Sequence, residues 1–235
     1  MKNRFFLLFI FITILCRAQD PNKFWQGWNS EYGSIDIHGG VYMPDLGPMN
    51  RYFRDKRIST LPAALNTIGG GVKSKIQTNF PAFHECHTSF QYFIPTNIQS
   101  DSLRFSLSGF NAGFDFGKDL LYKSKKLDLL VCIGFKGGRL KLMREDQLSH
   151  AKSYYTNPYL APLILIEPKA ILGPLCISLK AEYLFDISKT GWKHKSKNMP
   201  DIPYSRFTGA LLQLSLGYAI PYESRTATVT ESNDY

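Results

Sequence analysis

Apolar and polar side chains alternate most regularly in residues 174–187, which read PLCISLKAEYLFDI. From Leu175 to Ile187 every second residue is apolar, and the residues between are polar or charged except Leu184. A period of two predicts a β-strand with two unlike faces. The alternation exceeds the roughly 5–6 residues of an average soluble strand and reaches the roughly 9–11 that cross a bilayer. This stretch therefore predicts a strand long enough to span a membrane.

Seven further segments show the same alternation: 32–43, 67–78, 84–94, 103–117, 127–143, 159–172 and 207–220. The apolar phase changes near Ser108 and Gly109, which predicts a bulge in the fourth strand. Pro162 and Pro168 count against the sixth strand, because proline cannot donate a ladder hydrogen bond. No long helix is predicted, and residues 48–56 predict only two helical turns. The chain is therefore predicted to be all-β, with eight strands.

The predicted connections differ in length between the two ends of the strands. Those after the first, third, fifth and seventh strands are the longer ones, at 44–66, 95–102, 144–158 and 188–206. Those after the second, fourth and sixth strands are shorter overall, down to the tight turn at Gly173 and Pro174. Long loops on one side and short turns on the other are typical of outer-membrane barrels, and both chain ends then lie on the periplasmic side.

Residue size indicates which face of the strands is inside. Small residues such as Gly134, Ser178 and Gly217 recur on the polar faces, and a narrow eight-stranded lumen accommodates small residues and paired charges. The opposite faces carry large apolar residues that suit lipid. Aromatic residues near strand ends predict interfacial girdles: Tyr42, Tyr92, Phe93, Phe116, Tyr159, Phe185, Tyr218 and Tyr222. We predict an eight-stranded antiparallel up-and-down transmembrane β-barrel over residues 32–222; a soluble periplasmic barrel that binds a small apolar ligand is the alternative.

The first 18 residues have the features of a secretory signal peptide. Lys2 and Arg4 precede an apolar stretch at 5–15, and small residues at 16 and 18 permit cleavage before Gln19. A lipoprotein signal with Cys16 as the lipidated residue is disfavoured by the large Leu15 before it. Residues 19–31 are predicted to be an aromatic lead-in and residues 223–235 a polar tail. The signal peptide predicts export, and the predicted location is the outer membrane.

The chain is basic, with a formal net charge of +9 that falls to +6 when the signal peptide is removed. In an exported protein this balance favours contact with outer-membrane lipid and lipopolysaccharide head groups over nucleic acid, although a solvated basic surface is the simpler explanation. The mature chain keeps Cys86, Cys132 and Cys176 without a C-x-x-C spacing. The cysteines therefore predict neither a disulfide framework nor a zinc-finger type of metal site.

Together, a signal sequence that ends in Ala18 and Gln19 and eight alternating strands rich in glycine and aromatic residues resemble the small outer-membrane β-barrel proteins of Bacteroidota-type bacteria. The resemblance covers nearly all of the mature chain and rests on pattern, without a diagnostic motif. It implies an outer-membrane barrel of a kind that often lacks an assigned activity. The chain departs from many outer-membrane barrels in that a tail follows its last strand.

Charged residues on the predicted lumen face need partners inside a narrow barrel, and we expect them to form a structural salt-bridge network. They are Lys73, Lys75, Glu85, Asp115, Lys136, Glu167, Lys169, Lys180 and Glu182. Neither a metal site nor a cofactor is expected, because His84 and His87 face opposite sides of one strand. His87, Ser89 and Glu85 share a face as in a lipid-modifying hydrolase, but that face is predicted to line the lumen and not to meet lipid.

The last long connection is basic and contains Lys189, Trp192, Lys193, Lys195 and Lys197. Outside the cell it would contact lipid A phosphates or a partner protein, with a solvated loop as the simpler alternative. We therefore predict a non-catalytic outer-membrane barrel that serves as a structural or accessory component of an outer-membrane assembly, with other outer-membrane or periplasmic proteins as further candidate partners. A membrane-embedded lipid-modifying enzyme, such as a lipid A hydrolase, is the alternative.

Overall fold

The computed structural model describes residues 29–77, 85–100, 102–121, 124, 126–188, 190–194, 197–198, 202 and 206–221. The predicted signal peptide, the predicted tail and the lead-in up to residue 28 lie outside these residues. Eight long strands form the wall: β1 (Asn29–Pro44), β2 (Leu65–Gln77), β3 (Glu85–Gln99), β4 (Leu103–Asp119), β5 (Leu127–Asp146), β6 (Lys152–Leu172), β7 (Leu175–Leu184) and β10 (Gly209–Pro221). β1 therefore begins three residues before the predicted boundary at residue 32.

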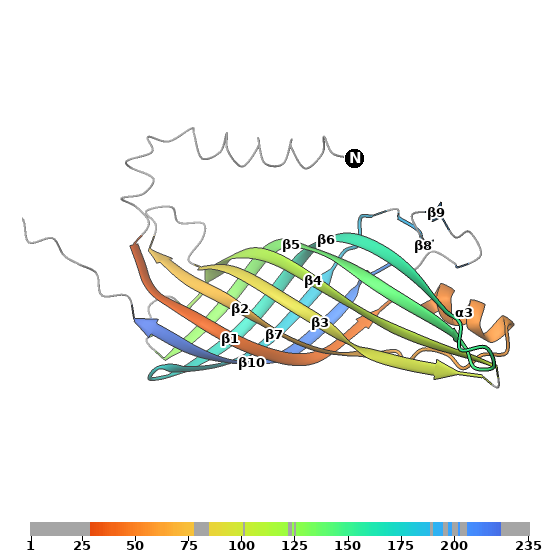
Figure 1. Cartoon of the computed structure of the whole chain (residues 1–235). Helices are drawn as coiled ribbons and strands as arrows, with labels where there is room; N and C mark the ends of the chain where they lie inside the picture. The colour runs from red at the N-terminus through yellow and green to blue at the C-terminus, as the bar shows by residue number, and fades with distance from the viewer. Residues whose placement is uncertain are drawn as a thin grey trace, which may run out of the picture.

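The eight strands close into one antiparallel barrel. β2 to β5 follow β1 on one side, β10, β7 and β6 follow it on the other, and the pairing of β5 with β6 completes the ring. β1 begins and β10 ends at the same end of the barrel (Figure 1). Closure pairs the edges of the sheet, as a bilayer requires. The prediction of an eight-stranded antiparallel barrel is confirmed.

Large apolar residues dominate the outer surface of the barrel, and a large group of charged residues is buried inside it. Ile37 is 65% exposed and Leu214 64%, whereas Asp36, between the outward-facing Ile35 and Ile37, is only 4% exposed. This distribution reverses that of a soluble barrel, whose exterior faces water. The alternative of a soluble barrel that binds an apolar ligand is therefore wrong, because it would leave the apolar exterior in water.

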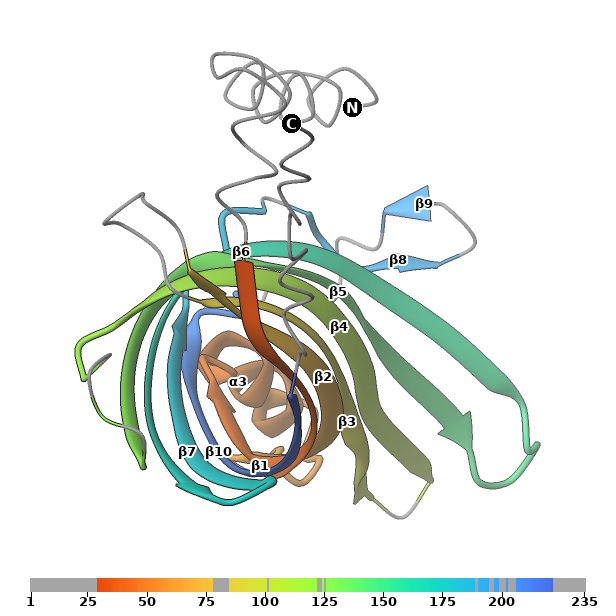
Figure 2. The same ribbon diagram turned by 90° about the vertical axis from the view of Figure 1, so that its left-hand side faces the viewer.

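Several strands are longer than predicted, because they continue into segments where loops were expected. β3 runs through Pro95 to Gln99, and β6 begins at Lys152 in place of residue 159. The connections at 100–102 and 147–151 are therefore short, and only 45–64 and 185–208 are long at this end of the barrel. The extended β3, β4, β5 and β6 project beyond the other strands on one side (Figure 2).

The prediction of a bulge in the fourth strand is wrong. β4 pairs with β5 without a register shift, and the extra residue lies on the other neighbour, β3, between Phe93 and Thr96, where it faces Ser108. Pro95 explains this position, because proline cannot donate to the ladder. The apolar phase of β4 changes for another reason: its inward residues are Asn111 and Asp115 in one half and Phe105 and Leu107 in the other.

An apolar core fills the end of the barrel that carries the helix α3 (Gly47–Asp55). Met49 and Phe53 lie one turn apart and are fully buried, and the Phe53 ring packs 5.1 Å from that of Phe105. Figure 2, which looks along the barrel, shows α3 within the ring of strands. Asn50 fixes the helix to the returning chain, since its side chain accepts from Leu61 N at 2.8 Å and donates to Leu61 O at 3.0 Å. The predicted helical turns are confirmed.

The core explains why three predicted girdle aromatics lie elsewhere. Tyr42, Phe93 and Tyr159 are at most 5% exposed and pack inside beneath α3, where the Tyr42 hydroxyl donates to the carbonyl of Phe207. Tyr92, Phe185 and Tyr218 do face outward, Phe116 is half-buried, and Tyr222 lies outside the described residues. In the part of the chain that the structure describes, no helix has both the length and the apolarity to cross a membrane.

Two adjacent glycines in β1 provide a test of the wall packing. A Cβ at Gly40 would collide with the carbonyl oxygen of Leu212 on β10, whereas a Cβ at Gly39 would lie 3.6 Å from Thr67 O, an ordinary contact. We expect Gly40→Ala to lower the free energy of unfolding by about 1–3 kcal/mol through overpacking. Gly39→Ala is the matched control and should change it by less than about 0.5 kcal/mol. Urea unfolding in detergent micelles measures both, and equal effects would contradict the packing argument.

Candidate functional site

A network of buried ion pairs crosses the lumen at the end opposite to α3. Lys169 on β6 donates to Glu85 at 2.6 Å and lies 2.9 Å from Asp128. His87 lies between two carboxylates, with Nε2 3.0 Å from Glu85 and Nδ1 2.9 Å from Asp115. All five side chains are almost completely buried. The network connects β3, β4, β5 and β6 across the barrel.

A second part of the network surrounds Asp36 on β1. Lys73 and Lys180 each lie 3.2 Å from Asp36 Oδ2, and His38 Nδ1 lies 3.0 Å from Asp36 Oδ1. Lys73 also contacts Glu167, which accepts a hydrogen bond from Ser178. Burial of a charge is costly unless the charge is paired and hydrogen-bonded. Charged side chains on β1 and β2 are therefore neutralised by side chains of opposite charge on β6 and β7.

Eight of the nine predicted lumen residues are described with their side chains, and all eight lie buried inside the barrel. Six of them take part in the two groups above, and Lys136 and Glu182 form a separate pair. Of Lys75 the structure describes only the backbone, opposite Glu85 in β2. Asp36, His38, His87 and Asp128 also contribute ion pairs, although they were not in the predicted set. Their alternation with outward apolar residues is the signal that would have identified them.

Glycines make room for these long side chains. Gly134 lies opposite Asp115, and Gly113 opposite Lys136, on the inner faces of β4 and β5. A Cβ at Gly113 would collide with the wall and lie 2.5 Å from Lys136 Cγ. Glycine on one strand therefore accommodates a charged side chain on the next. The cavity beside Asp36, Lys73 and His87 has a volume of about 10 Å³, which is room for one water molecule.

The arrangement of His87 does not suit a Ser–His–Glu hydrolase. Both ring nitrogens of His87 lie at pairing distance from carboxylates, and no hydrogen bond joins His87 to Ser89 among the described residues. A nucleophilic serine requires a base within hydrogen-bond reach and access to substrate. His87 is 3% exposed and faces the lumen. This triplet therefore provides no support for a lipid hydrolase.

The end of the barrel that carries α3 is open and basic. A cavity of about 330 Å³ lies between α3 and the extended strands, with Lys56 and Arg144 beside Tyr52, Phe105 and Tyr155. Arg51, Arg54 and Arg57 are exposed on and beside the helix. The volume is at the small end of the range for ligand pockets. This cavity is therefore a candidate ligand site at the α3 end of the barrel.

The predicted contact loop needs one correction. Trp192 is 1% exposed, so it belongs to the apolar core and cannot be part of a contact surface. Burial of a large indole anchors the loop to the barrel. Lys193 is half-buried in β8 (Lys193–His194), which pairs with β9 (Lys197–Asn198). Lys189 and Lys195 lie outside the described residues, and of Lys197 only the backbone is described.

A group of basic residues, here called the basic collar, lies on the outer wall near the α3 end and consists of Arg104, Arg139 and Lys141. Arg139 is paired with Phe110, an exposed residue of the apolar surface. Lys141 Nζ lies 4.3 Å from the ring centroid of Tyr154, an arrangement that permits a cation–π interaction. The collar therefore begins where the apolar surface ends.

The geometry of β5 fits a membrane span below the collar. Its residues 127–137 cover roughly 33 Å at about 3.3 Å per residue. A strand tilt of about 40° reduces this to about 25 Å, the height of the apolar band of an outer-membrane barrel. Outward residues in this interval include Leu127, Val131 and Ile133, and the next outward positions are Arg139 and Lys141.

Comparison with solved structures supports the same fold. A major outer membrane protein from Thermus thermophilus superposes with a TM-score of 0.51 at 9% identity, covering 80% of this chain and 98% of that chain. Ail, the attachment invasion locus protein of Yersinia pestis, gives 0.49 at 12% identity, covering 82% of this chain and 100% of that chain. No protein-family model and no curated protein matches the sequence. The superposition on the Thermus thermophilus protein agrees with the closed topology of the strands and shows the fold of an outer-membrane β-barrel.

The isolated Lys136–Glu182 pair provides a test of the lumen network. Lys136→Met leaves Glu182 buried without its partner, so we expect a loss of about 3–5 kcal/mol in the free energy of unfolding. The double variant Lys136→Met/Glu182→Leu removes both charges and should regain most of that loss, because an apolar pair of similar volume replaces the ion pair well. Lys118→Met, on the outer wall, serves as the control. Urea titration in micelles measures the three values, and a double variant no more stable than the single one would refute the pairing.

Proposed function

We propose that the protein is a non-catalytic outer-membrane barrel that spans the membrane with α3 outward and holds anionic lipid phosphates, of the lipopolysaccharide class, on its basic collar. The observation that carries the proposal is the change on the outer face of β5 from apolar residues to Arg139 and Lys141. Basic residues at the membrane surface attract anionic head groups at about 1 kcal/mol each. Such a protein would be a structural or accessory component of the outer membrane, in keeping with the resemblance to barrels of Bacteroidota-type bacteria.

The open α3 end would provide the surface for a partner in that role. The exposed Arg51, Arg54 and Arg57 project from a helix whose position is fixed by the buried Met49 and Phe53. A fixed basic surface suits an acidic partner, because complementary charge steers encounter and sets specificity. The second candidate, a lipid-modifying enzyme, gains no support from the contacts of His87.

Membrane insertion and orientation can be tested together. We expect the full-length protein to stay in the membrane fraction after a carbonate wash and to migrate differently on gels before and after heating, because a closed barrel resists unfolding. An impermeant maleimide on intact cells should label Arg54→Cys at the α3 end and leave Lys126→Cys at the opposite end unlabelled. Labelling of Lys126→Cys alone would show the reverse orientation, and release by carbonate would exclude a membrane barrel.

The basic collar can be tested by lipid retention. The variant Arg139→Gln/Lys141→Gln removes two cations, which together contribute about 2 kcal/mol, or roughly 30-fold in affinity for phosphorylated lipid. Phosphorylated lipid that co-purifies with the protein should fall accordingly, as measured by mass spectrometry. Arg51→Gln/Arg54→Gln removes two cations from α3 and should leave the amount unchanged. Equal losses in both variants would show that general charge attraction, and not the collar, retains the lipid.

A further inference from the structure

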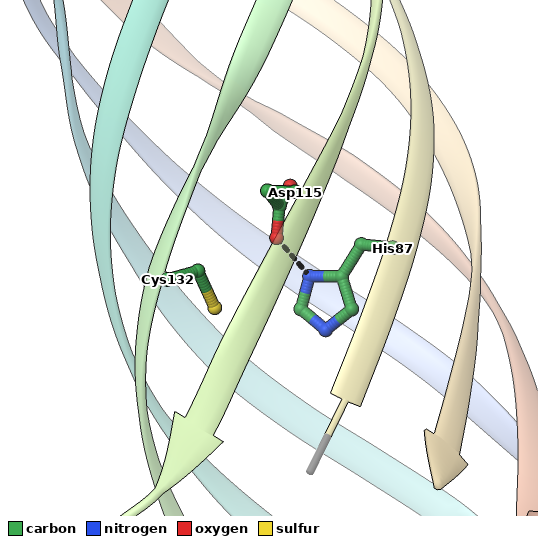
Figure 3. A group of neighbouring side chains, drawn as sticks. All are labelled: His87, Asp115 and Cys132. Atoms are coloured by element: carbon green, nitrogen blue, oxygen red, sulfur yellow. Dashed lines mark ion pairs between the residues drawn. The ribbon is translucent and has the colours of Figure 1, made fainter. Parts of the chain in front are cut away.

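Three side chains inside the barrel converge from neighbouring strands. His87 on β3, Asp115 on β4 and Cys132 on β5 are all buried, and one ligand atom of each lies within 4.8 Å of the others. Figure 3 shows the imidazole and the carboxylate in contact and the Cys132 sulfur directed toward them. Imidazole nitrogen, carboxylate oxygen and thiolate sulfur are the three donor types of protein zinc sites.

The register of the strands produces this convergence. His87 is paired with Asp115, and Cys132 is paired with Gly117, one row away on the lumen face. A Cβ at Gly117 would collide with the Cys132 sulfur, so the absence of a side chain at Gly117 leaves the space that the thiol occupies. Each of three adjacent strands therefore supplies one ligand from its lumen face.

The partners of His87 resemble the surroundings of a metal-bound histidine. Nε2 of His87 lies 3.0 Å from Glu85 Oε2, and Lys169 donates to the other oxygen of Glu85 at 2.6 Å. A carboxylate that accepts from one ring nitrogen fixes the tautomer and leaves the other nitrogen free to bind a metal. That other nitrogen, Nδ1, is the one 2.9 Å from Asp115 Oδ1.

Two buried carboxylate oxygens beside this group lack a hydrogen-bond donor. Asp115 Oδ1 and Glu167 Oε2 are inaccessible to solvent and have no hydrogen-bond partner, although each lies near His87 Nδ1, at 2.9 and 4.0 Å. A buried anionic oxygen without a donor is costly. Without a metal, a protonated His87 would reduce this cost through its charge, and the Cys132 thiol would act as a weak hydrogen-bond donor to Asp115. A bound cation satisfies both oxygens and the thiol.

We propose that His87 Nδ1, Asp115 and Cys132 bind one divalent transition-metal ion of the zinc class. The thiol releases its proton to solvent as the sulfur binds, and the imidazole binds in its neutral form. The three ligands leave a fourth position, and Glu167 Oε2 lies nearby, 4.0 Å from His87 Nδ1. The soft thiolate favours zinc over magnesium or calcium. The ion would connect β3, β4 and β5, and it is independent of the lipid contacts proposed above.

The test uses the folded full-length protein in detergent micelles, stripped with a chelator and titrated with Co²⁺ and Zn²⁺. We expect one equivalent of Co²⁺ to bind with a thiolate-to-metal charge-transfer band, and Zn²⁺ to abolish the band by displacement. Cys132→Ser should remove the band and weaken Zn²⁺ binding at least tenfold. Cys176→Ser, at the other buried cysteine, should leave both unchanged. Heat-modifiable gel mobility checks that each variant is folded.

Two further variants keep the proposal falsifiable if Cys132→Ser does not fold. Gly117→Ala retains all three ligands but displaces the sulfur, and should weaken Zn²⁺ binding. Glu85→Gln retains the ligands but weakens the orientation of His87, and should cost about 10–100-fold in affinity. The absence of stoichiometric Co²⁺ or Zn²⁺ binding by the wild-type protein would overturn the proposal. A band that survives Cys132→Ser, or that disappears equally in Cys176→Ser, would also overturn it.

Discussion

Closure of the sheet between β5 and β6 is the constraint on which the rest of the structure depends. A bilayer offers no hydrogen bonds to strand edges, so the wall must form a ring with every edge paired. A ring of eight strands has a narrow interior, and period-two alternation sends half of the side chains into it. Charged residues on that face can then be compensated only by one another. The ion pairs of Lys73, Lys169 and Lys180 follow from this geometry.

The interior consists of two zones with different chemistry. At the α3 end it is an apolar core, with Phe53 and Trp192 fully buried, and at the other end it is the ion-pair network. Between them, Asn111 donates to Gln91 and to Tyr159, each at 3.0 Å. The apolar zone fixes α3 and the loops, and thereby the basic surface that we propose meets a partner. The charged zone connects opposite walls and contains the proposed metal ligands.

Glycine has a particular role in the narrow lumen. Where one strand carries an inner functional side chain, the neighbouring strand often has glycine beside it, as at Gly113 beside Lys136 and Gly117 beside Cys132. This alternation lets long inner side chains fit within a narrow lumen. It also means that a change of one glycine displaces a functional group on another strand, so wall packing and site chemistry are coupled.

The sequence by itself determined the eight strands, the inward polar face and the short helix, because period-two alternation and residue size are local properties. It located the irregular pairing near Ser108 but placed the bulge on β4, whereas the extra residue lies across from Ser108 in β3, at Pro95. It also missed the inward positions of Tyr42, Phe93 and Trp192. These inward positions depended on the loop with α3 folding back into the barrel mouth, where an apolar interior replaced water. It also missed the convergence of His87, Asp115 and Cys132, because their proximity arises from the register of three strands. Local pattern specifies which face a residue occupies, and only closure of the ring decides which residues meet across it.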